Sequence, residues 1–137
     1  MVDVVDASVM VAVLYPQDPF HHVSRTWFDR HLHAGNHLAA PLLLMSEVVG
    51  VIRRETGDAV LARQTVHWLY ALPELQRYPL DEALTQLAAD VAVDLALRGA
   101  DAVYVALAAQ LQLPFITWDR QQRERGGQRI EAREPSS

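Results

Sequence analysis

Short apolar runs alternate with longer amphipathic segments along this chain. Val2–Asp6 is rich in β-branched residues, which predicts a strand. An apolar segment, Ser8–Tyr15, follows at once and predicts a helix with Ser8 as its N-cap and Pro16 beyond its end. A strand that opens directly onto a helix is typical of an α/β unit.

Four further segments carry apolar residues at helical spacing. The predicted helix that begins at Leu42 ends at Gly57, where a glycine C-cap is expected. Gly99 follows the predicted helix that ends at Arg98. Asp81 is expected to act as the N-cap of the helix that ends at Arg98. These predicted helices are Phe20–Ala34, Leu42–Gly57, Asp58–Leu72 and Asp81–Arg98.

The stretch from Arg98 to Asp119 predicts a turn, a buried helix, a proline break and a short apolar strand. The other strand candidates are His37–Pro41, Leu75–Leu80 and Arg129–Arg133, and Pro79 restricts the second of these to an edge. Strands that alternate with helices indicate an α/β sandwich on a mainly parallel sheet. We expect one domain over residues 1–133 and a frayed tail over 134–137.

The composition is that of a globular protein: half of the 137 residues are apolar and 21% are charged. No apolar run approaches the roughly 18 residues that a membrane span needs. The N-terminus lacks the basic and long apolar regions of a secretory signal, and cysteine is absent. We therefore expect a cytoplasmic protein without disulfides or thiolate metal sites.

The net charge of −5 argues weakly against a general nucleic-acid coat. It does not exclude a nuclease, because acids that hold a metal lower the net charge while the charge of the metal itself is not counted. The chain contains arginine but no lysine. Arginine suits bidentate phosphate contacts, but compositional bias explains its use equally well.

Two aspartates stand at the ends of predicted strands. Asp6 ends the first strand and Asp119 follows the apolar strand near the C-terminus, so neighbouring parallel strands would bring both into one crevice. Asp101 begins the helix that leads into the strand before Asp119. We expect this helix to start near the opposite end of the sheet unless it packs across it, so spacing alone does not place Asp101 with the other two.

Glu47 is the only charged residue between Leu38 and Ile52. A buried carboxylate without a partner costs several kcal/mol or keeps its proton. A divalent cation would leave it charged, and so would Arg53 or Arg54. Each of these four acids alone also has an ordinary explanation as a cap, a turn residue or a solvent-exposed charge.

Taken together, four segments resemble the acidic motifs of PIN domains in order and spacing. They are VVDASVMVAVL, LLLMSEVV, LRGADAVYVALA and LPFITWDR. Their residues are similar to those of the VapC toxins of bacterial toxin–antitoxin pairs. The resemblance runs from Val2 to about Arg133. It implies a PIN-like three-layer α/β/α sandwich with strand order 3-2-1-4-5, with Asp6 beside Asp119 and Asp101 in the same pocket.

The resemblance also implies which residues act. The catalytic and metal-binding acids of the family correspond to Asp6, Glu47, Asp101 and Asp119. Ser8 corresponds to the hydroxyl residue that supports the first acid, although a helix cap explains it too. Thr117 resembles the hydroxyl near the last acid, and an ordinary strand threonine is the alternative.

Oxygen ligands suit Mg²⁺ or Mn²⁺ better than zinc. The resemblance implies an endoribonuclease that hydrolyses RNA phosphodiester bonds, in tRNA or rRNA, and leaves a 3′-hydroxyl and a 5′-phosphate. As a toxin it would inhibit translation until a VapB-like antitoxin neutralises it, and it would form a homodimer. Candidate phosphate contacts are Arg25, Arg98 and Arg120, although a solvated surface arginine is the simpler explanation for each.

The aromatic residues nearest the acids in sequence are Trp118, Tyr104, Tyr15 and Phe20. They could stack on unpaired RNA bases, although core packing is the simpler explanation for most of them. Two other readings stay open. The chain could be a PIN-like module that binds RNA or protein without cutting, or a small-molecule phosphohydrolase, which would normally carry a second aspartate where Ser8 stands.

Overall fold

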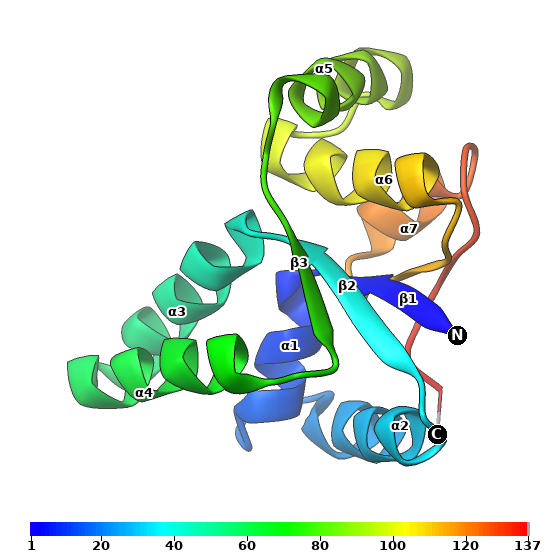
Figure 1. Ribbon diagram of the computed structural model, residues 1–137. Helices are drawn as coiled ribbons and strands as arrows, with labels where there is room; N and C mark the ends of the chain where they lie inside the picture. Colours follow the sequence, from blue (N-terminus) through cyan, green and yellow to red (C-terminus); the bar gives the residue numbers. More distant parts are fainter. Residues whose placement is uncertain (137) are drawn as a thin grey trace.

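The computed structural model describes residues 1–136 and arranges them in three layers, with a sheet between two layers of helices (Figure 1). The sheet has five parallel strands in the order β3-β2-β1-β4-β5. This confirms the predicted three-layer fold and strand order. The strands are β1 (Val2–Val5), β2 (His37–Pro41), β3 (Leu75–Tyr78), β4 (Phe115–Ile116) and β5 (Ala132–Arg133).

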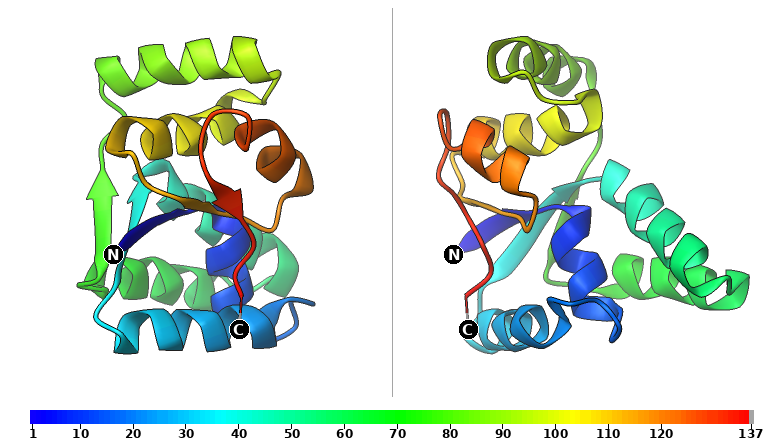
Figure 2. Two further views of the ribbon diagram at one scale, coloured as in Figure 1. Left: turned by 90° about the vertical axis from the view of Figure 1, so that its right-hand side faces the viewer. Right: turned by 180° about the vertical axis from the view of Figure 1, so that it is seen from behind.

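Helices cover both faces of the sheet, as two views from other sides confirm (Figure 2). α1 to α4 lie on one face and α5 to α7 on the other (Figure 1). The helices are α1 (Ala7–Leu14), α2 (His21–His33), α3 (Leu43–Thr56), α4 (Ala59–Ala71), α5 (Glu82–Leu95), α6 (Gly99–Leu111) and α7 (Arg120–Gly126).

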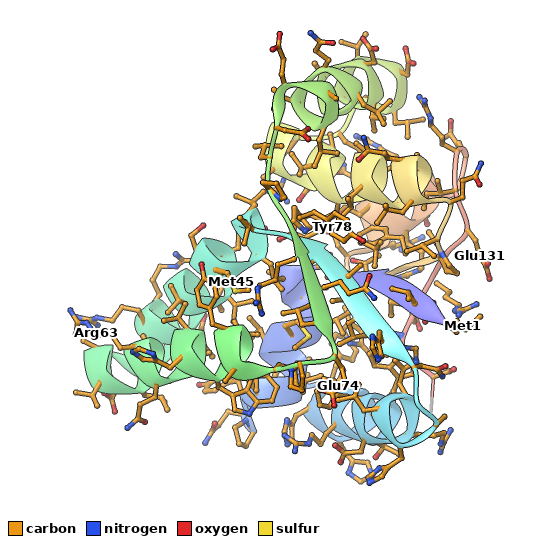
Figure 3. All side chains as sticks on the ribbon, viewed as in Figure 1. Met1, Met45, Arg63, Glu74, Tyr78 and Glu131 are labelled. Atoms are coloured by element: carbon orange, nitrogen blue, oxygen red, sulfur yellow. The ribbon has the colours of Figure 1, made fainter. Side chains whose placement is uncertain are left out.

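The middle of the sheet is apolar on both sides because both sides are covered. Val4 and Val5 of β1 and both residues of β4 are fully buried. α6 packs against β1, β2 and β4, and its residues 101 to 108 are all buried. Side chains fill the space between α3 and α4, whereas Arg63 projects from the outer end of that pair (Figure 3).

Two predicted helix ends are wrong. The N-cap of α1 is Asp6 rather than Ser8, because the Asp6 carboxylate accepts the backbone N–H of Val9. α5 ends at Leu95, three residues before Arg98, and Ala96 caps it in the left-handed conformation with φ of 53°. This conformation is uncommon for a residue with a Cβ and is usually adopted by glycine. Because alanine stands there instead, the sequence does not mark the end of the helix.

None of the helices in residues 1–136 is both long and apolar enough to cross a membrane. Leu75–Tyr78 is an edge strand, as the proline after it predicts. The last residue of the expected tail, Ser137, lies outside the described residues. The division into one domain over 1–133 and a tail stays a prediction.

Candidate functional site

Two of the predicted site residues follow the adjacent ends of β1 and β4. The strands pair in parallel, with Val5 opposite Ile116, so the chain leaves both at the same edge of the sheet. Asp6 stands directly after β1, and Asp119 stands three residues after the end of β4. The carboxyl ends of strands in such a sheet are where ligands generally bind.

Asp101 lies at this same edge, which corrects the expectation that its helix starts at the opposite end. α6 connects to β4 and runs antiparallel to it, so the helix that leads into a parallel strand begins at the carboxyl edge. The Gln122 amide shows the proximity directly: Nε2 donates to Asp101 Oδ1 at 3.0 Å and to Asp6 Oδ2 at 3.3 Å. Asp101 is buried, with 8% of its surface exposed.

Asp6 is surrounded by uncharged donors. The Ser8 hydroxyl donates to Oδ1 at 2.6 Å and the Thr117 hydroxyl donates to Oδ2 at 2.5 Å. The backbone of Val9 also donates to Oδ1. Burial raises the pKa of Asp6 from 3.8 to about 6, and these hydrogen bonds only partly offset the cost of desolvating the charge.

Thr117 and Ser8 also join the two strand ends to each other. Thr117 Oγ1 accepts the backbone N–H of Asp119 at 3.0 Å, and Ser8 Oγ accepts that of Trp118 at 3.0 Å. Asp119 in turn caps α7, accepting the Gln122 N–H at 2.9 Å. One hydrogen-bonded network therefore sets the positions of Asp6 and Asp119.

Glu47 reaches the site from α3 and is partly buried. Its partner is neither Arg53 nor Arg54 but the hydroxyl of Tyr104, which donates to Glu47 Oε1. Tyr104 is buried and stacks on Phe115 of β4. Burial and the bond to Glu47 raise the pKa of the tyrosine, so its hydroxyl stays protonated and remains a donor. Tyr104 therefore orients Glu47, a role that the sequence pattern did not indicate.

Gln122 is the other residue that sequence reasoning missed. It is buried and bridges Asp6 and Asp101, while its own Oε1 has no hydrogen-bond partner. The signal in the sequence is only its place one turn after Asp119 in a short helix. An unpaired buried carbonyl oxygen is costly, so it identifies a position that a cation or water would satisfy.

Arg98 supplies the only basic side chain in contact with these acids among the described residues. Its Nε donates to Asp101 Oδ2 at 2.9 Å, and its Nη2 lies 4.0 Å from Asp119 Oδ2. Three-quarters of the arginine side chain is exposed, so the pair is open to solvent and to screening.

All four predicted acids line one cleft of about 400 Å³. Its polar wall also includes Asp18, Ser8 and Gln122. Its apolar wall is formed by Val11, Val51, Phe20, Trp118 and the ring of Tyr104. Five carboxyl groups thus face one concave space with a single arginine across two of them, which favours a positively charged ligand.

The donor chemistry fits a hard divalent cation. Every candidate ligand is a carboxylate oxygen, and the unpaired Gln122 Oε1 is an amide oxygen of the kind that such ions also accept. Within residues 1–136, however, no three acidic or histidine side chains converge closely enough to hold one ion as they stand. Arg98 and Gln122 bridge the acids in this arrangement, so binding an ion would require both to move.

Solved structures with this fold include toxins of toxin–antitoxin systems. The sarcin–ricin loop cleaving toxin VapC20 of Mycobacterium tuberculosis is 15% identical, with 88% of this chain and 92% of that chain covered and a TM-score of 0.71. VapBC2 of Rickettsia felis, solved with a DNA fragment from its promoter, is 11% identical, with 98% of both chains covered and a TM-score of 0.72.

PAE2754 of Pyrobaculum aerophilum is 22% identical, with 96% of this chain and 82% of that chain covered and a TM-score of 0.67. At these identities the likeness is one of fold. No curated protein sequence matches the chain significantly. The PIN domain family matches residues 4–128, nearly the whole length of the chain. The chain therefore belongs to the PIN domain family.

Proposed function

We propose that this chain is an Mg²⁺- or Mn²⁺-dependent endoribonuclease and the toxin of a toxin–antitoxin pair. The observation that carries the proposal is that Asp6, Glu47, Asp101 and Asp119 line one cleft although they come from four separate segments. The PIN family and the fold shared with VapC20 and VapBC2 support the same reading.

Asp6 and Asp101 are the proposed principal metal ligands, and Asp119 and Glu47 complete the set. A bound ion would activate water and stabilise the leaving oxygen in phosphodiester hydrolysis. Water adds to phosphorus and the P–O3′ bond breaks, so the products are a 3′-hydroxyl and a 5′-phosphate. The protein's part is positional: Ser8 and Thr117 hold Asp6, and Tyr104 holds Glu47.

The direct test is cleavage of a labelled structured RNA by the purified protein with Mg²⁺ or Mn²⁺. We expect Asp6→Asn and Asp101→Asn to lose cleavage. Asp58→Asn is the matched control, because Asp58 also caps a helix but does not line the cleft. Cleavage by the two site variants at the wild-type rate would contradict the assignment.

The toxin role needs a test in cells. Induction of the chain alone in a bacterium should arrest translation, and sequencing of RNA ends should identify a cut tRNA or rRNA. Co-expression of a VapB-like antitoxin should restore growth. Unimpaired growth together with intact RNA would contradict the toxin role. The proposed homodimer is checked separately by light scattering of the purified chain.

A PIN-like module that binds without cutting is the second candidate. It is favoured by the contacts of Arg98 and Gln122, because each side chain bridges two of the acids. Calorimetric titration with Mn²⁺ separates the two functions. Binding that disappears in Asp101→Asn supports the nuclease, and the absence of acid-dependent binding supports the inert module.

A further inference from the structure

Phe20 and Trp118 form a parallel aromatic pair at the cleft. Their ring centroids are 4.1 Å apart and their planes differ by 8°. Phe20 stands at the N-cap position of α2 and Trp118 lies between Thr117 and Asp119, so the pair joins residues about a hundred positions apart in sequence. Both rings line the same cleft as the four acids.

The indole is fixed in its plane. Its Nε1 donates to the buried hydroxyl of Ser24 at 2.7 Å, and its backbone N–H donates to Ser8 at 3.0 Å. The backbone N–H of Phe20 donates to Asp18 Oδ1 at 2.8 Å, and this bond restrains the backbone that carries the ring. The pair is thus a rigid element attached to the network that positions Asp6 and Asp119.

Core packing does not account for Phe20. It is 45% exposed, one of eight large apolar residues that are exposed in residues 1–136. One face of its ring lies on Trp118, so a further planar group could stack only on the opposite face. An immobilised, solvent-facing ring beside a polar cleft is well suited to stacking with another planar group.

We propose that Phe20, backed by Trp118, is a stacking platform for one unpaired base of the RNA substrate. The inference rests on the proposed nuclease function and adds a substrate subsite to it. Every base has a π-face, so such a platform binds single-stranded nucleotides without reading a particular base. Trp118 directly precedes Asp119, so the stacked base lies within a nucleotide or two of the phosphodiester that is cut.

The neighbouring acids explain why a base rather than a phosphate takes this position. Asp18 and Asp119 flank the pair in the cleft wall, and among the described residues the one basic side chain in contact with the cleft acids, Arg98, is already paired with Asp101 at 2.9 Å. A phosphate would be repelled here in the absence of a cation, whereas an uncharged base avoids the repulsion and covers the apolar ring.

The test is an abasic scan. A fluorescein-labelled ten-nucleotide single-stranded RNA and its singly abasic variants are titrated by anisotropy against chains carrying Asp101→Asn to prevent cutting. When Phe20 is intact, one abasic position should weaken RNA binding about 5- to 100-fold. With Phe20→Leu the intact RNA should bind as weakly as that abasic RNA, and the penalty of the abasic position should disappear. Phe20→Tyr should preserve both values.

The control is Tyr70→Ala, which removes an exposed aromatic ring of α4 that does not line the cleft. Equal melting temperatures show that Phe20→Leu is folded. An unchanged abasic profile in Phe20→Leu overturns the platform, and so does an affinity loss matched by Tyr70→Ala. If only antitoxin binding weakens, the ring is a protein contact and the proposal is wrong.

Failure of the platform is distinguishable from failure of the nuclease function. In otherwise wild-type protein, Phe20→Leu should raise KM for the short RNA about 5- to 100-fold with a smaller change in kcat, because stacking acts on binding. Unaltered KM with normal cleavage rejects the platform alone. Absence of RNA cleavage by the wild-type chain rejects the function on which the platform rests.

Discussion

The two buried aspartates of the first strand region, Asp3 and Asp6, are held in different ways. They are three residues apart, 1% and 2% exposed, and burial raises the pKa of both. Asp3 has a cationic partner, because Arg133 lies 3.5 Å from its Oδ2, and the ring of His31 lies 3.9 Å away. The hydrogen-bond partners of Asp6 are uncharged hydroxyl, amide and backbone groups.

This difference separates a structural carboxylate from one that is available to a ligand. At Asp3 the protein supplies the positive charge that a buried carboxylate needs. At Asp6 it supplies hydrogen bonds that fix the orientation but leave the charge without a cation. Only Asp6 lines the cleft. The protein therefore leaves charge uncompensated at the edge of the sheet where we propose that a metal binds.

The largest expected effect is on catalysis. Asp6→Asn should lower the rate of RNA cleavage about 10²- to 10³-fold, because it removes a proposed ligand of an ion worth several kcal/mol to the transition state. Asp3→Asn should leave the rate close to that of wild type. Single-turnover cleavage with saturating Mn²⁺ measures both. Equal losses of cleavage in the two variants would show that the rate depends on a buried carboxylate as such, and not on a carboxylate that is free to bind a metal.

The second effect is on stability without metal. The pKa of Asp6 is raised to about 6 in the folded chain, so the folded state loses stability as pH rises from about 4 to 6. Asp6→Asn removes this loss and should stabilise the chain by about 3 kcal/mol at pH 8.

Urea unfolding in EDTA at pH 8 and pH 4 measures this difference. At pH 4 the wild-type carboxyl is largely protonated in the folded chain, so the two proteins should differ little. A gain of the same size at both pH values would mean that packing, rather than the charge of Asp6, is responsible.

The third effect concerns Gln122, which contacts Asp6 and has no counterpart at Asp3. Gln122→Leu should weaken Mn²⁺ binding about 10-fold, because the variant loses an amide oxygen that could face the ion once the side chain has moved off the two acids. Calorimetry measures the affinity, and Gln122→Glu serves as the oxygen-retaining control. Tighter binding by the leucine variant would show that the amide only obstructs the site.

The smallest effect is at the Asp3 end. Arg133→Met should lower the free energy of unfolding by about 1 kcal/mol at pH 7, a modest value because the Arg133 side chain is 42% exposed. The loss should vanish at low pH, where Asp3 is protonated and needs no cation. Arg63→Met, at the outer end of the α3–α4 pair, is the control in thermal unfolding. A loss of equal size at pH 3 would exclude the ion pair as its cause.

Local patterns predicted most of the secondary structure, because caps, glycine and apolar periodicity act within a few residues. His37–Pro41 is a strand with the expected bounds, and Asp81 and Gly57 cap helices where their residue types predict. The end of α5 was missed because Ala96 adopts a left-handed conformation that its residue type disfavours.

The candidate acids could be identified in the sequence, but their neighbours could not. Strand ends and an isolated charge single out Asp6, Asp119 and Glu47, and the four PIN-like motifs add Asp101. Tyr104 and Gln122 carry no comparable signal, since tyrosine in an apolar helix and glutamine in a polar one are ordinary. Their roles depend on contacts across 57 positions to Glu47 and 116 positions to Asp6.

By itself, the sequence determined the elements, the order of the strands through its family motifs, and which carboxylates are unusual. The tertiary structure decided how those carboxylates are held. It placed Arg133 beside Asp3, uncharged donors around Asp6, and the ring of Phe20 on Trp118. Hydrogen bonds and charge pairs act over a few ångströms, so they become defined only when packing brings distant segments together.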